Sequence, residues 1–169
     1  MTRHSRASSL LILMLLSARS FAVDAKAPID VQAYKPPIRV ACLGDSITAG
    51  VGAKPGWAWP DQLDRMLGEQ WDVRNFGHSG ASVAKEEKHT IWSQKEYRSA
   101  LLLHPDVVII LLGTNDTKPE NWAKKAEFPK LYKELVASFQ KLSSTPRVFC
   151  GTPPYVGKKG NFGINEAGV

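Results

Sequence analysis

Four short apolar runs, each ending at a glycine, constrain the fold of this chain more than any other feature. They are residues 38–43, 71–76, 106–112 and 147–150, which precede Gly44, Gly77, Gly113 and Gly151. The segments between them carry apolar residues at helical spacing, over residues 59–69, 92–103 and 127–143. Apolar strands that alternate with helices predict an α/β fold with a parallel sheet covered on both faces.

The first 22 residues have the order of a secretory signal peptide. A basic start at Arg3, His4 and Arg6 precedes the apolar run 10–16, and small residues stand at Ser20 and Ala22. This run is too short to span a bilayer, so we expect cleavage after Ala22, export to the periplasm or beyond, and no stable membrane insertion. An uncleaved anchor is the alternative. The predicted organisation is a signal peptide over 1–22, a linker over 23–37 and one domain over 38–169.

Charge and cysteine content exclude several classes of function. The net charge is +6, but three of the arginines lie in the predicted leader, and no basic stripe interleaved with aromatics indicates nucleic-acid binding. Cys42 and Cys150 both lie in strand-like runs, which favours two free core thiols over a disulfide. No spacing of cysteines and histidines predicts a metal site. The glycines of residues 50–56 do not match a dinucleotide-binding fingerprint, because their spacing is one residue too long.

Residues that suit acyl transfer stand at the ends of three of the predicted strands, polar side chains at two of them and Gly77 at the third. Asp45 and Ser46 follow Gly44, and Asn115 and Asp116 follow Gly113. The carboxyl ends of parallel strands share one edge, where ligands bind. Ser46 is the candidate nucleophile. The backbone N–H groups of Ser46 and Gly77 and the amide of Asn115 are candidate oxyanion donors. Taken singly, each segment is more often a helix cap or a turn, and the coincidence at three strand ends favours a site.

Together, these segments resemble the first three sequence blocks of the SGNH (GDSL) hydrolases. The matching stretches are GDSIT at 44–48, NFGHSG at 75–80 and GTND at 113–116. Residues 105–122 and the TPP at 152–154 further resemble a bacterial branch described as sialate O-acetylesterase-like or acetyl-esterase-like.

The resemblance implies a three-layer flavodoxin-like SGNH hydrolase fold and ester hydrolysis without metal or cofactor. It assigns Ser46 as nucleophile, with Gly77 and Asn115 in the oxyanion hole. Asp45 and Asp116 are then supporting residues that fix the loops.

The fourth block of this family, an Asp-x-x-His that supplies the general base, has no match here, and no histidine follows His104. We therefore expect a C-terminally incomplete domain without its last strand and helix. His78 is expected to line the substrate pocket or to hold the loop that follows residues 71–76. It is also the secondary candidate for the general base.

The expected substrate is a small acyl ester, above all O-acetyl groups on carbohydrate. A lipase or lysophospholipase-like activity and an arylesterase activity are alternatives, since one constellation serves many esters. A third alternative is an inactive relative that only binds glycan, through stacking on Trp57, Trp59 or Trp92.

Overall fold

The computed structural model describes residues 27–85, 88–154 and 163–164. The predicted signal peptide lies outside the described residues. Contacts divide the chain into two compact units, Met1–Val31 and Gln32–Val169, and the second contains the whole sheet. A single 3₁₀ turn, η1 (Val31–Ala33), lies within the predicted linker.

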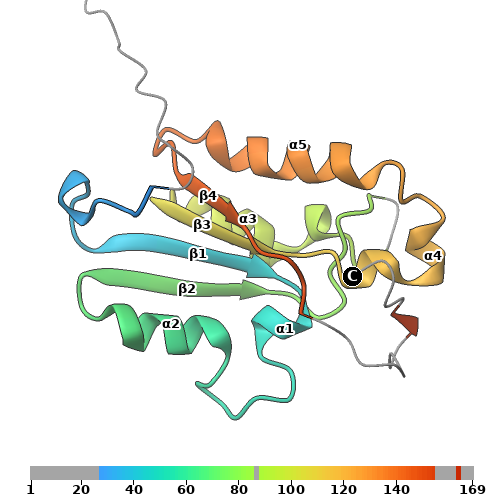
Figure 1. Cartoon of the computed structure of the whole chain (residues 1–169), viewed down its shortest axis with the longest axis horizontal. Coiled ribbons are helices and arrows are strands. Elements are labelled where there is room, and N and C mark those ends of the chain that lie inside the picture. The colour runs from blue at the N-terminus through green and yellow to red at the C-terminus, as the bar shows by residue number, and fades with distance from the viewer. Residues whose placement is uncertain (1–26, 86–87, 155–162, 165–169) are drawn as a thin grey trace, which may run out of the picture. The chain divides into compact units, whose positions relative to one another are not determined.

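Four parallel strands form one sheet in the order β2-β1-β3-β4 (Figure 1). They are β1 (Ile38–Gly44), β2 (Trp71–Gly77), β3 (Val107–Leu111) and β4 (Arg147–Cys150). The register sets Gly44 opposite Gly77 on one side and opposite Leu111 on the other, so the carboxyl ends of these strands lie at one edge. The predicted α/β class and strand positions are confirmed.

The connecting helices largely follow the predicted segments. They are α1 (Ser46–Ala49), α2 (Trp59–Leu67), α3 (Lys95–Leu102), α4 (Pro119–Trp122) and α5 (Phe128–Gln140), with 3₁₀ turns η2 (Ile91–Ser93) and η3 (Asn115–Thr117). The predicted helix over 92–103 is wrong in its first turn. Gln94 is extended there, and its side-chain amide donates to the carbonyl of Thr90. This contact separates η2 from α3.

The apolar faces of the helices differ in their burial. On α5, Leu131, Leu135 and Phe139 are buried in the core, as the spacing predicts. On α2, by contrast, Met66 is 82% exposed, and the buried residue of this helix is Pro60. Helix α2 packs against β2 and α5 against β4, at opposite ends of the sheet (Figure 1).

The two cysteines are free thiols, but only one lies in the core. Cys42 is buried in β1, whereas Cys150 is exposed at the end of β4. The prediction of a second core thiol is therefore wrong, because β4 is paired on one side only among the described strands.

A polar clamp joins β1 to the start of β3. The Arg39 backbone N–H and Nε donate to Asp106 Oδ2 at 2.9 and 3.0 Å, and Nη2 donates to Oδ1 at 3.0 Å. Partial burial alone would raise the pKa of Asp106, but these hydrogen bonds lower it overall. In the part of the chain that is described, no helix combines the length and apolar character needed to cross a membrane.

Candidate functional site

Asp45, and not Ser46, caps the short helix that follows β1. Asp45 has extended backbone angles, and its Oδ1 accepts the Ile47 N–H at 2.9 Å. Ser46 is the first residue of α1 and is partly buried. The capping role therefore falls to the neighbouring carboxylate, which leaves the serine hydroxyl available for chemistry.

Two glycines let α1 lie directly on the ends of β1 and β2. A Cβ at Gly44 would overlap the Thr48 side chain, and a Cβ at Gly77 would overlap backbone atoms of Thr48 and Ala49. Only glycine therefore allows this approach, which sets the position of Ser46 relative to β2. Trp59 adds to the packing, since its Nε1 donates to Thr48 Oγ1 at 3.2 Å.

The Gly77 N–H, a predicted oxyanion donor, is already paired within the chain. It donates to Asn75 Oδ1 at 2.9 Å, and Asn75 Nδ2 donates in turn to the Thr48 carbonyl at 2.7 Å. The Asn75 side chain thus joins the end of β2 to α1. The sequence reasoning did not assign this residue, although it stands inside the NFGHSG stretch.

Asn115 connects all three strand ends. It is buried in η3, and its Nδ2 donates to the Ala81 carbonyl at 3.0 Å and to Asp45 Oδ2 at 3.4 Å. The structure therefore brings the GDSIT and GTND segments together, as the parallel sheet predicts. Asn121 Nδ2 holds the backbone of Asn115 through its carbonyl at 2.8 Å.

Asp45 and Asp116 are both buried, and burial raises both pKa values. For Asp116 the pKa rises to about 6; the N–H groups of Val83 and Ala84 partly offset the effect of burial, while nearby Asp45 adds to it. These N–H groups donate to Asp116 Oδ1 at 2.8 and 3.0 Å. Asp116 thereby holds the loop after β2, in keeping with the supporting role that the resemblance implies.

His78 lies beside the serine loop and carries a carboxylate partner. Its backbone N–H donates to the Gly44 carbonyl at 2.9 Å, and its Nδ1 lies 3.2 Å from Glu96 Oε2. The Glu96 carboxylate therefore lies near the imidazole, but this Oε2 accepts no hydrogen bond from the described residues. Glu96 was missed by the sequence reasoning, since it stands in the first turn of α3 with no motif around it.

The three tryptophans considered for glycan stacking have different environments. Trp57 is 57% exposed, with the Arg65 guanidinium 4.8 Å from its ring centroid. Trp59 bonds to Thr48, and Trp92 donates to the Val83 carbonyl and packs edge-on against Tyr97. Of these three, Trp57 is the ring open to a ligand.

A parallel α/β sheet that gathers a serine, a glycine and an asparagine at its carboxyl edge is the arrangement of the SGNH class. The model of the GDSL-like lipase/acylhydrolase family matches residues 42–167. The chain belongs to this family.

Comparison with individual proteins gives both sequence and structural similarity. The chain is 38% identical over 105 residues to an acetylxylan esterase from Xylanibacter ruminicola, covering 61% of this chain and 22% of that protein. A carbohydrate acetylesterase from Sinorhizobium meliloti has the same fold, with a TM-score of 0.61, 22% identity and coverage of 76% and 73% of the two chains. The aryl esterase of M. smegmatis gives a TM-score of 0.56, 24% identity and coverage of 77% and 72%.

Replacing Gly77 by alanine tests the close packing of α1. The new Cβ meets backbone atoms, so the helix has to move, and we expect the free energy of unfolding to fall by about 3 kcal/mol or more in urea titrations. Gly151→Ala is the matched control. Its Cβ would lie 3.1 Å from the flexible Leu111 Cδ1, and we expect a loss below about 1 kcal/mol. Equal losses in the two variants would contradict this account.

Asp116→Asn tests the buried carboxyl. Because its pKa is raised to about 6 in the folded chain, the folded state binds the proton more tightly than the unfolded state, whose pKa is 3.8. Its contribution to stability is therefore present below pH 4 and is lost as the pH rises through 6. We expect the unfolding free energy of the wild type, relative to Asp116→Asn, to fall by about 2 kcal/mol between pH 4 and 6.5. A difference that stays constant over this range would refute the assignment.

Proposed function

We propose that this chain is a serine-dependent carboxylic ester hydrolase that removes small acyl groups, above all O-acetyl groups from carbohydrate. The observation that carries the proposal is the contact of Asn115 Nδ2 with Asp45 Oδ2 at 3.4 Å. This contact sets a side-chain amide donor next to the loop of Ser46, at the edge where Gly77 also lies. Membership of the GDSL-like lipase/acylhydrolase family supports the same chemistry.

In the first step, Ser46 Oγ attacks the ester carbonyl carbon while its proton passes to a general base. The carbonyl oxygen becomes an oxyanion, which the N–H groups of Ser46, Gly77 and Asn115 stabilise. The alcohol then leaves with a proton from the base. Water, activated by the same base, releases the acyl group and restores the Ser46 hydroxyl.

The donors need only small rearrangements to serve in this way. The Asn115–Asp45 contact of 3.4 Å is long for a hydrogen bond, so this amide proton can turn to an oxyanion at low cost. The Gly77 N–H is paired more closely, and the Asn75 amide oxygen has to move aside when substrate binds.

The rate of ester hydrolysis depends above all on the general base that takes the proton of Ser46. Within the described residues His78, whose imidazole lies near Glu96, is the candidate base next to the loop of Ser46. Loss of a triad histidine costs on the order of 10⁴ to 10⁶ in rate in serine proteases. Among the described residues no histidine is hydrogen-bonded to Ser46 Oγ, and we therefore propose that the described part of the chain hydrolyses esters slowly.

The substrate class is supported by the acetylxylan esterase that is 38% identical to this chain. The aryl esterase among the structural relatives keeps an aryl ester as the second candidate substrate. The exposed ring of Trp57 favours a glycan-binding role without catalysis as the remaining alternative.

The test compares the wild type with Ser46→Ala on p-nitrophenyl acetate and on acetylated xylan oligosaccharides, with and without added imidazole. Imidazole alone also hydrolyses p-nitrophenyl acetate, so the rate without protein is subtracted. We expect the remaining slow hydrolysis to be accelerated by imidazole and removed by Ser46→Ala, because imidazole supplies a base to the serine. Ser138→Ala, on α5, is the matched control and should keep the full rate. His78→Ala then shows whether His78 supplies the base for the residual rate.

Glycan binding that survives Ser46→Ala, without hydrolysis by the wild type under any of these conditions, would overturn the proposal in favour of a binding role. Hydrolysis at ordinary esterase rates without imidazole, and lost on His78→Ala, would identify His78 as a full base.

We further propose that the chain is exported after cleavage behind Ala22. In a bacterial host, N-terminal sequencing of the exported protein should begin at Val23. The variant Leu13→Arg interrupts the apolar run, so its protein should stay inside the cell. Its leader should remain uncleaved, with Met1 retained. A wild-type protein that also retains Met1 would indicate an uncleaved anchor instead.

A further inference from the structure

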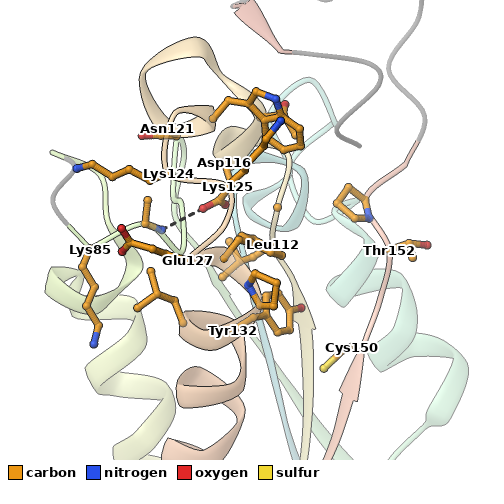
Figure 2. A pocket seen from close by; sticks show the side chains of 18 of the residues that line it. Lys85, Leu112, Asp116, Asn121, Lys124, Lys125, Glu127, Tyr132, Cys150 and Thr152 are labelled. Carbon is orange, nitrogen blue, oxygen red and sulfur yellow. Dashed lines mark hydrogen bonds between the residues drawn. The ribbon is translucent and has the colours of Figure 1, made fainter.

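A cavity of about 640 Å³ lies beside the candidate site, and neither Ser46 nor Asn115 lines it. We call it the α5 cavity, since its walls come from the start of α5, from α4 and from the ends of β3 and β4 (Figure 2). Its apolar walls are formed by Leu112, Trp122, Phe128, Leu131 and Tyr132. A volume of this size suits a small molecule.

Asp116 provides the polar group of this cavity. Its side chain lines the wall and is 6% exposed. Oδ1 accepts the N–H groups of Val83 and Ala84, whereas Oδ2 is buried and has no hydrogen-bond partner among the described residues. A buried carboxylate oxygen without a donor is costly, and a ligand that donates to Oδ2 would recover that cost.

The charges around the cavity favour a ligand whose hydrogen-bond donor to Asp116 is uncharged. Lys85, Lys124 and Lys125 line the cavity together with Glu127 (Figure 2). Lys85 is paired with Glu134 at 2.6 Å, and the Lys125 ammonium lies 5.2 Å from the centroid of the Trp122 ring. The lysines still outnumber the acidic groups of the lining, so a cationic ligand such as an alkylammonium group is disfavoured. A hydroxyl group donates to Oδ2 without this penalty.

We propose that the α5 cavity binds a neutral aromatic alcohol of the phenol type. Its ring lies among Trp122, Phe128 and Tyr132, where aromatic side chains favour stacked or edge-to-face contacts. Its hydroxyl donates to Asp116 Oδ2. This inference goes beyond ester hydrolysis and does not depend on Ser46.

The experiment measures the binding of phenol to the full chain at pH 8 by isothermal titration calorimetry and saturation-transfer NMR. We expect a dissociation constant on the order of 1 mM, as suits so small a ligand. Anisole has the same ring without the hydroxyl proton and should bind at least about fivefold more weakly. Ser46→Ala should bind phenol as the wild type does, which separates this site from the esterase proposal.

Two variants locate the site. Asp116→Asn replaces the acceptor Oδ2 by a donor of the same shape and should weaken phenol binding about tenfold or more, whereas Asp72→Asn, on β2, should not. Ala84→Leu fills the cavity and should abolish binding, whereas Ala53→Leu, on an exposed loop, should not. Circular dichroism verifies that each variant is folded, and Ala84→Leu keeps the test open if Asp116→Asn unfolds.

Equal binding of phenol and anisole, full binding by both folded cavity variants, or no binding by the wild type at about 10 mM phenol would overturn the proposal.

Discussion

The contact of α1 with two strand ends that carry no side chain is the constraint on which the candidate site depends. Gly44 and Gly77 face each other in the register of β1 and β2, and each has atoms of α1 where a Cβ would stand. With any other residue at 77, α1 would lift away from the sheet and take Ser46 with it. Position 77 is therefore set by packing as well as by its predicted chemistry.

Around this contact, buried polar side chains hold the loops in place, and these side chains lose their contact with water. Asp45 caps α1 and contacts Asn115, while Asp116 holds the backbone at Val83 and Ala84. Burial raises both carboxyl pKa values, so each acid is destabilised as an anion while it orders a loop. Buried carboxyl groups with shifted pKa values are typical of functional sites.

The carboxyl edge of the sheet thus presents two neighbouring environments. The Ser46 side is built from backbone amides and side-chain amides, as acyl transfer requires. One residue beyond Asn115, the side chain of Asp116 lines a cavity with aromatic walls. Adjacent residues of one short turn, η3, therefore belong to two sites of different chemistry.

The sequence by itself determined the parallel α/β architecture and the segments that meet at its edge, because short runs that end at glycine and alternate with helical spacing are strong local signals. The helix over 92–103 was placed too early, since the extended Gln94 depends on a contact with Thr90 that no periodicity shows. The sequence also indicated Ser46, Gly77 and Asn115 as candidates.

Only the tertiary structure decided how these groups are engaged. Asp45 caps α1, and the Asn75 side-chain oxygen accepts the Gly77 N–H. Glu96 contacts His78. The cavity beside Asp116 likewise forms only when Leu112, α4 and α5 come together, since they supply its walls. Hydrogen-bond partners and cavities depend on distances between segments far apart in the chain, and local sequence patterns carry no such distances.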